Sequence, residues 1–200
     1  MEKKKIPNLN DLRDRAFECA QSHGFYDQPF SEKHEKMMLI CEIAEAFQAD
    51  RENRHADIDT FNMSIERYEQ KCETNIFDDG FYEVAFEDWI KDTFEDEITD
   101  IIIRLLSIYG CLGTDLSFIQ RTMNNEDLFP LFQSHREFTS DAIDLCQKVL
   151  EMNLEKGHIS DWPLFILFLL AQSKGIDIEW HILHKMSYNE LRPRLNGKKY

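Results

Sequence analysis

The segment Met37-Met-Leu-Ile-Cys-Glu-Ile-Ala-Glu-Ala-Phe47 decides the expected fold, and Glu97-Ile-Thr-Asp-Ile-Ile-Ile-Arg-Leu-Leu106 repeats its pattern. Apolar residues in both segments recur at spacings of three and four, which is the periodicity of an α-helix with one buried face. Carboxylates interrupt both apolar runs, and they are Glu42, Glu45, Glu97 and Asp100. Residues three apart on a helix lie about 60° apart around its axis, so each pair would share one face. We therefore expect two helices whose paired acids border a buried seam.

The same apolar spacing continues through most of the chain. Only seven glycines and five prolines interrupt its 200 residues, so we expect an all-α protein. The expected helices cover residues 10–23, 31–54, 89–110, 140–156, 160–173 and 177–190. We interpret residues 55–90 and 113–138 as irregular or inserted segments; the first is expected to be an insertion or a hairpin-like excursion with one short helix near 64–73. The prediction is a single domain, residues 1–200, folded as a bundle of about five or six helices.

The chain is strongly acidic. It has 38 acidic and 23 basic residues, which give a net charge of -15 at pH 7. This charge repels nucleic-acid backbones and anionic membranes, so we expect neither polymeric DNA or RNA nor a membrane as a partner. A small phosphorylated ligand remains compatible, because bound metal and a few local Lys and Arg residues can meet its charge.

Cysteine usage and the lack of a long apolar segment indicate a reducing compartment. The five cysteines are odd in number and widely spaced, so we interpret them as buried thiols. No apolar stretch of signal-peptide length follows the basic start of the chain. The longest apolar run, Leu164–Ala171, is too short to span a bilayer. We expect a cytoplasmic protein.

Acidic pairs three residues apart are common in this chain, and most such pairs lie on solvated helix faces. Other examples are Asp11/Asp14, Glu32/Glu35, Glu66/Glu69, Asp92/Glu95 and Asp141/Asp144. The pairs at positions 42/45 and 97/100 differ because apolar residues flank them on both sides, so their carboxylates should be partly buried. Like charges held that close need neutralisation, and Mg²⁺ provides it through oxygen ligands.

Taken in this setting, the two motifs resemble those of the all-α nucleoside triphosphate pyrophosphohydrolases, which include MazG-like enzymes and the dimeric dUTPases. The hallmark of that family is E-x-x-E on one helix and E-x-x-D on a later helix. The closing segment Lys185-Met-Ser-Tyr-Asn189-Glu-Leu-Arg192 is similar to that of MazG-like members. The chain departs from the family in its spacing, because 51 residues lie between Glu45 and Glu97 and a further insertion precedes the closing segment.

The resemblance implies a MazG-like bundle that cleaves nucleoside triphosphates between the α and β phosphates, giving the monophosphate and pyrophosphate. Such an activity fits house-cleaning of the nucleotide pool. The four acids would hold Mg²⁺, with Mn²⁺ as a second option, and Glu45 or Glu42 would orient or deprotonate the attacking water. Lys185, Asn189 and Arg192 recur at i, i+4 and i+7, and this face suits phosphate oxygens. Relatives assemble as dimers or tetramers, so a homodimer or higher homo-oligomer is expected.

Two other functions stay open at this stage. A carboxylate-bridged di-iron bundle needs Glu-x-x-His motifs, and the chain contains Glu52-Asn-Arg-His55 and Glu155-Lys-Gly-His158. A non-catalytic helical interaction protein would use the Trp162–Leu170 segment for assembly. That segment is apolar nearly all round, so it lies either in the core or between subunits.

Overall fold

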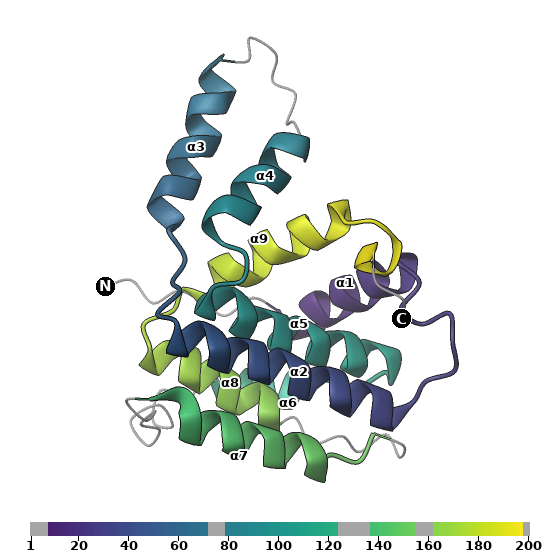
Figure 1. The fold of residues 1–200 in the computed structure, drawn as a ribbon. Helices are drawn as coiled ribbons and strands as arrows, with labels where there is room; N and C mark the ends of the chain where they lie inside the picture. Colours follow the sequence, from purple (N-terminus) through teal and green to yellow (C-terminus); the bar gives the residue numbers. More distant parts are fainter. Residues whose placement is uncertain (1–7, 72–78, 124–136, 155–161, 198–200) are drawn as a thin grey trace.

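The computed structural model describes residues 8–71, 79–123, 137–154 and 162–197, and all nine regular elements of five or more residues in these ranges are α-helices (Figure 1). The helices are α1 (Leu9–Ser22), α2 (Glu32–Arg51), α3 (Ile58–Lys71), α4 (Asp79–Trp89), α5 (Phe94–Cys111), α6 (Ser117–Met123), α7 (Phe138–Glu151), α8 (Trp162–Ser173) and α9 (Ile178–Leu191). A short 3-10 helix, η2 (Arg194–Gly197), follows α9. The all-α prediction is confirmed.

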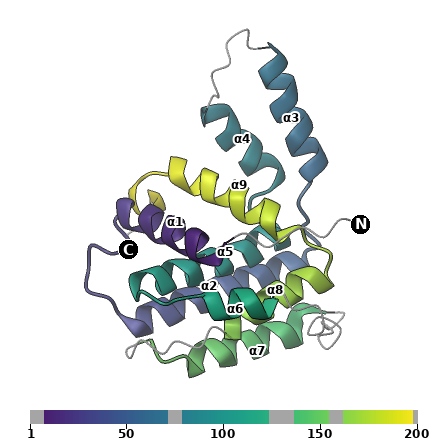
Figure 2. The same cartoon turned by 180° about the vertical axis from the view of Figure 1, so that it is seen from behind.

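Helix α5 is the centre of the bundle. It packs against α1, α2, α8 and α9, while α7 covers α2 and α8 on the other side (Figures 1 and 2). Most of its side chains are buried because apolar residues occur nearly all round it, including Ile98, Ile102, Leu105 and Tyr109 at 0% exposure. The second acidic motif therefore lies on a helix of which two thirds of the residues are buried.

Local capping signals fix several helix ends where the sequence predicts them. The Ser31 side chain accepts a hydrogen bond from the His34 N–H at the start of α2, and Asp177 does the same for Trp180 at the start of α9. Gly24 and Gly175, which follow α1 and α8, have φ values of 84° and 74°, a left-handed conformation that glycine adopts readily.

Residues 55–90 contain more helix than the single short helix expected near 64–73. The stretch forms the helical hairpin α3–α4, which projects from the bundle (Figure 1). The hairpin has its own small core, in which Phe61, Tyr82 and Phe86 meet Tyr188 of α9. Because Trp89 ends α4, helix α5 begins at Phe94 rather than at residue 89.

Residues 113–138 also contain more helix than expected. Helix α6 occupies Ser117–Met123, and α7 begins at Phe138; the rest of that stretch, residues 124–136, lies outside the described residues. The bundle itself consists of α1, α2, α5, α7, α8 and α9, in agreement with the predicted number. The additional helices come from the two stretches interpreted as irregular.

The apolar helix α8 lies in the main core of the protein. Leu164, Leu167 and Leu170 are 0% exposed and belong to the main core, whereas Trp162 at the start of the helix is exposed. Among the described helices, none has both the length and the apolar character needed to cross a membrane. The cysteines at 19, 41, 111 and 146 are free thiols and half-buried, less deeply than expected.

Candidate metal and phosphate site

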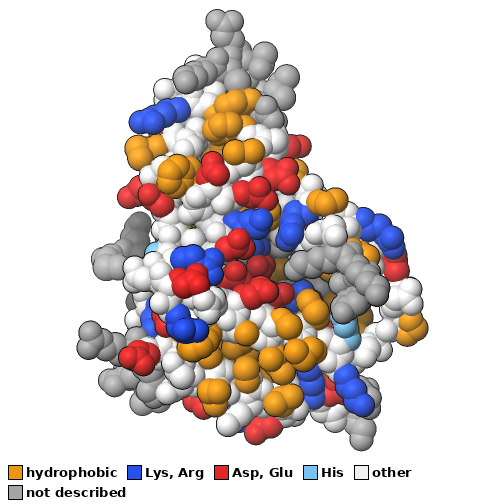
Figure 3. Space-filling model, viewed as in Figure 1, with side chains coloured by type: hydrophobic (Ala, Val, Ile, Leu, Met, Phe, Trp, Pro, Cys, Tyr) orange, Lys and Arg blue, Asp and Glu red, His pale blue; other side chains and the backbone are white. Residues whose placement is uncertain are grey.

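A pocket of about 540 Å³ opens where α1, α2, α5 and α9 approach one another. It is lined by all seven residues that the sequence predicts for the site: Glu42, Glu45, Glu97, Asp100, Lys185, Asn189 and Arg192. Figure 3 shows acidic side chains gathered at the centre of this face, with basic side chains around them and an apolar area below. The packing of α2 against α5 thus brings together the two acidic motifs, which lie far apart in the sequence.

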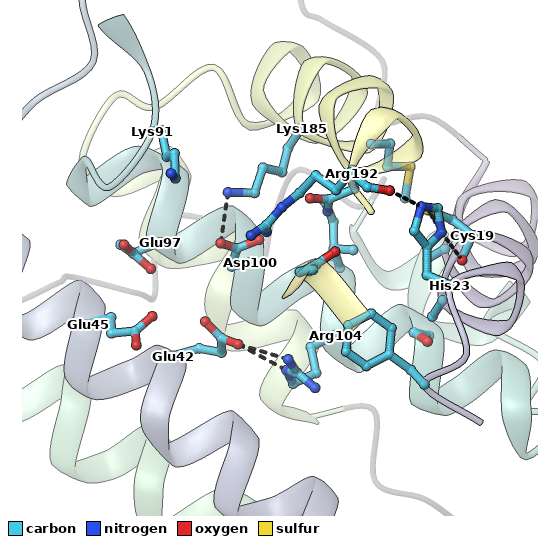
Figure 4. A pocket seen from close by; sticks show the side chains of 18 of the residues that line it. Cys19, His23, Glu42, Glu45, Lys91, Glu97, Asp100, Arg104, Lys185 and Arg192 are labelled. Atoms are coloured by element: carbon cyan, nitrogen blue, oxygen red, sulfur yellow. Dashed lines mark hydrogen bonds and ion pairs between the residues drawn. The ribbon is translucent and has the colours of Figure 1, made fainter. Parts of the chain in front are cut away.

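Three of the predicted acids form a compact cluster. Glu42 of α2 and Glu97 and Asp100 of α5 each place one carboxylate oxygen within 4.8 Å of the others (Figure 4). Glu45 lines the same pocket but is exposed, and it is not part of this close group. The cluster could hold one hard divalent cation through carboxylate oxygens.

Burial perturbs these carboxyl groups strongly. Burial, followed by repulsion from Asp100 and Asp96, raises the pKa of Glu97 to about 9. Burial and Asp100 raise the pKa of Glu42 to about 7, against the opposing effect of Arg104. One oxygen of Glu97, Oε2, is buried and has no hydrogen-bond partner among the described residues. A bound cation would satisfy this oxygen and offset the repulsion, so the donor set fits Mg²⁺.

Arg104 neutralises one side of the cluster. Its Nε and Nη2 both donate to Oε1 of Glu42, at 3.1 and 3.0 Å. The two residues lie on facing helices, α5 and α2, so the ion pair also ties the two motif helices together. A guanidinium held in this way fixes the orientation of the Glu42 carboxylate.

Lys185 forms ion pairs with two acidic residues of α5. Its ammonium group is 3% exposed and donates to Oδ2 of Asp96 at 2.7 Å and to Oδ2 of Asp100 at 2.8 Å. Burial alone would lower the pKa of Lys185, but the charges of Asp100 and Asp96 outweigh it and raise the pKa. A phosphate that reaches Lys185 would therefore share its ammonium with Asp96 and Asp100.

Asp96 was missed by the sequence reasoning. It is 1% exposed, and burial raises its pKa to about 6 in spite of Lys185. Its Oδ2 also accepts from the Asp92 N–H at 3.1 Å. The signal that could have found it is its place directly before Glu97, in the first turn of a helix capped by Thr93.

The remaining predicted residues sit at the end of α9. Asn189 is half-buried, and its Oδ1 has no hydrogen-bond partner among the described residues. Arg192 is the C-cap of α9, because the helix ends at Leu191, and its side chain runs from there toward the carboxylates in Figure 4. Lys198 and Lys199, near the end of the chain, lie outside the described residues.

Lys91 is a second missed residue of the pocket. It follows α4, lines the pocket and forms an ion pair with Glu87 at 3.3 Å (Figure 4). The sequence predicts helix at this position, as part of 89–110, but Lys91 lies between the end of α4 at Trp89 and the start of α5 at Phe94, and no motif spacing marked it. With Arg192 it adds positive charge beside an otherwise acidic cluster.

Of the two Glu-x-x-His motifs that a di-iron site would need, one does not line the pocket and the other lies outside the described residues. The His55 ring bonds to Glu95 through Nδ1, at 2.8 Å, and neither His55 nor Glu52 lines the pocket. Glu155 and His158 lie outside the described residues. The one group of metal-binding side chains found among the described residues consists of carboxylates alone.

Comparisons of the chain with protein-family models, with curated proteins and with solved structures gave no match. The resemblance to nucleoside triphosphate pyrophosphohydrolases therefore stays a prediction from the motifs, and the site is interpreted from its own geometry.

Proposed function

We propose that this protein is a Mg²⁺-dependent nucleoside triphosphate pyrophosphohydrolase, which cleaves between the α and β phosphates to give a nucleoside monophosphate and pyrophosphate. The observation that carries the proposal is the convergence of Glu42, Glu97 and Asp100 within 4.8 Å, in a pocket that basic residues also line. Oxygen-only ligands favour a hard cation such as Mg²⁺, or Mn²⁺ in its place.

Mg²⁺ bound at this cluster would neutralise phosphate charge and would lower the pKa of an attacking water. The basic side chains lie where a phosphate chain would enter. Lys91 and Arg192 approach the carboxylates from different segments, and neither is buried. In a protein of net charge -15, these cations offset the repulsion that a triphosphate would otherwise meet.

Glu45 is our choice for the residue that orients or deprotonates water. It follows Glu42 by one helical turn, lines the pocket and stays outside the close carboxylate group. Its carboxylate is exposed and has no ion pair with a cation among the described residues, so it is available to accept a proton. Glu42 is a weaker choice, because Arg104 already holds one of its oxygens.

The test is to incubate the purified protein with Mg²⁺ and a panel of ordinary and modified nucleoside triphosphates, and to identify the products by ³¹P NMR. We expect a monophosphate and pyrophosphate from at least one substrate. Release of orthophosphate, or no turnover with any substrate, would contradict the proposal.

A substitution in the site distinguishes the activity of this protein from that of a contaminating enzyme. Glu97→Gln should lower kcat about a hundred- to a thousandfold, as for groups that stabilise charge at the reacting centre, and circular dichroism should show unchanged helix content. Glu69→Gln is the matched control, because Glu69 is an exposed glutamate on α3 with the same chemistry. Equal activity of the Glu97→Gln variant and the control would remove Glu97 from the site.

A further inference from the structure

The pocket extends beyond the carboxylate cluster. Its lining on α5 reaches Ser107, which lies about two helical turns, or about 10 Å, past Asp100. Helix α2 is antiparallel to α5 and lines the same stretch as far as Glu35. In Figure 4, Lys91 and Arg104 lie on opposite sides of the carboxylates. We call the end of the pocket opposite to Lys91 the distal end, and it is lined by Tyr26, Glu35, Ile103 and Ser107.

Two hydroxyl groups meet at the distal end. The Tyr26 hydroxyl lies 2.8 Å from the hydroxyl of Ser107, which is itself buried. Burial raises the pKa of Tyr26, and the negative charge of Glu35 adds to this effect, so the Glu35 carboxyl lies near the hydroxyl pair. Two hydroxyls that share one hydrogen bond have a second proton between them, and a carbonyl oxygen of a ligand could accept it.

Glu35 is the acidic group of the distal end. It is 8% exposed, and its carboxyl has neither a hydrogen bond nor an ion pair with another described residue. Burial raises the pKa of Glu35, although the charges of Arg104 and His34 oppose this. It also lies about two helical turns before Glu42 and outside the compact carboxylate group, so a metal bound there would not satisfy it. A nearly buried carboxylate needs hydrogen-bond donors, and a ligand in the pocket can provide them.

The two ends of the pocket suit the two ends of a nucleoside triphosphate. With the α phosphate beside the metal-binding carboxylates, the pyrophosphate would lie toward Lys91, whose ammonium group attracts its charge. The ribose and base would then extend toward the distal end, where Ile103 offers a half-buried apolar side chain. The two helical turns between Glu42 and Glu35 leave room for a ribose, so the edge of the base would reach Glu35.

A carboxylate distinguishes bases by their hydrogen-bond donors, because it can only accept. Guanine has two donors side by side, N1–H and the 2-amino group, and these match the two oxygens of one carboxylate. Adenine and cytosine have an acceptor next to the amino group, and uracil has a carbonyl on each side of its N–H. Guanine also has a carbonyl next to N1–H, which the hydroxyl pair of Tyr26 and Ser107 can bind. The distal end therefore fits guanine better than the other bases.

We propose that Glu35 is the specificity-determining residue of the pocket and that it selects substrates with a guanine-type base, a purine that carries both N1–H and a 2-amino group. The position of the phosphates in this inference rests on the proposed function. The base preference itself can be measured by binding, without any hydrolysis.

The first test compares nucleoside monophosphates as ligands of the full-length protein. Calorimetry with MgCl₂ at about pH 8, well above the ordinary pKa of a glutamate, gives the Kd of guanosine, inosine, adenosine, cytidine and uridine monophosphate. The guanosine and inosine compounds differ only in the 2-amino group, so the ratio of their Kd values measures that one contact. We expect inosine monophosphate to bind about tenfold more weakly than guanosine monophosphate, and the other three more weakly still. Equal Kd values for the guanosine and inosine compounds would overturn the proposal.

The second test is Glu35→Gln, which keeps the size of the side chain. The glutamine amide places its NH₂ group against one N–H of guanine whichever way it turns, so the Kd of guanosine monophosphate should rise about tenfold to a hundredfold. The Kd of adenosine monophosphate should stay the same or fall, because an amide can pair with a neighbouring donor and acceptor of adenine. Circular dichroism should show unchanged helix content. Glu69→Gln, at an exposed position of α3, is the control and should keep the preference of the wild type.

The results separate this inference from the proposed function. Guanosine monophosphate that binds with the expected preference, and loses it in Glu35→Gln, supports the role of Glu35 even if no triphosphate is cleaved. An unchanged preference in Glu35→Gln, or no binding of any monophosphate, overturns that role. Release of pyrophosphate from nucleoside triphosphates without a preference for the guanine base would leave the proposed function in place and show that Glu35 does not select the base.

Discussion

Buried carboxylates define the candidate site at the scale of single residues. Glu97 is 5% exposed and Asp96, beside it, is 1% exposed. Most of the other buried residues of their helix, α5, are apolar. A carboxylate in such a place is costly unless a cation or hydrogen bonds satisfy it. Lys185 provides this for Asp96, whereas Glu97 has no such partner among the described residues. Ionisation of the Glu97 carboxyl is therefore unfavourable in the folded protein without a bound cation.

Glu97→Gln should stabilise the metal-free protein at alkaline pH. The folded-state pKa of Glu97, about 9, lies above its ordinary value, so the folded protein holds a proton that the unfolded chain releases. The stabilisation that this proton brings is complete below the unfolded pKa and is lost as pH rises toward 9. At about pH 8, removing the buried acid should add about 1–3 kcal/mol, or about 2–4 °C in Tm for each kcal/mol.

The measurement is Tm by calorimetry in EDTA, from about pH 5 to pH 9. The Tm of the wild type should fall relative to that of Glu97→Gln as pH rises, and the exposed-site variant Glu69→Gln should follow the wild type. Parallel curves for the wild type and Glu97→Gln would show that Glu97 ionises normally in the folded protein.

The site could be predicted in part because helical spacing is a local property. The positions of Glu42, Glu45, Glu97 and Asp100 follow from three-residue spacing within single helices. Ion pairs across the fold have no such signal: Lys185 and Asp96 are 89 residues apart, and Arg104 and Glu42 are 62 apart. The partners that set the charge of each carboxylate therefore emerge only from the packing of α2, α5 and α9.

At the scale of elements, the hairpin α3–α4 is the part of the fold whose two helices the apolar spacing did not predict. Its interior is a narrow aromatic cluster rather than a continuous apolar stripe. Phe61 of α3 makes edge contacts with Tyr82 of α4 and with Trp180 of α9, at centroid distances of 5.7 and 5.5 Å. Helices that begin with a side-chain cap, such as α2 at Ser31 and α9 at Asp177, were predicted well because that signal is local in the sequence.

Phe61→Ala should detach the hairpin and leave the bundle intact. Phe61 is 1% exposed and is the aromatic residue shared by α3, α4 and α9, so its loss should cost about 3–5 kcal/mol of local stability. Hydrogen exchange should accelerate in α3 and α4 while α2 and α5 stay protected. Met63→Ala, at a 45% exposed position of the same helix, is the control and should change little. Equal loss of protection in all helices would mean that the hairpin and bundle unfold together.

For the whole molecule, the site exists only when the bundle is assembled. Its carboxylates come from α2 and α5, and the basic residues Lys91 and Arg192 beside them follow α4 and α9. Helix α8 fills the core between α5 and α7 within one chain, so the predicted homo-oligomer would use another surface. The meeting of α2, α5 and α9 was expected from the motifs, whereas the packing of the hairpin against α9 and of α7 against α2 was not, because no motif links those segments.

Mg²⁺ should therefore stabilise the entire chain against heat. A ligand that binds only the folded protein adds about 2.7 kcal/mol at one hundred times its Kd, which corresponds to roughly 5–10 °C in Tm for a chain of this size. Because the net charge is -15, any salt also reduces self-repulsion, so NaCl at equal ionic strength is the necessary reference. Glu97→Gln should respond to MgCl₂ and to NaCl alike. If the wild type gains no more from MgCl₂ than from NaCl, the carboxylate cluster does not bind the ion, and the stabilisation comes from screening alone.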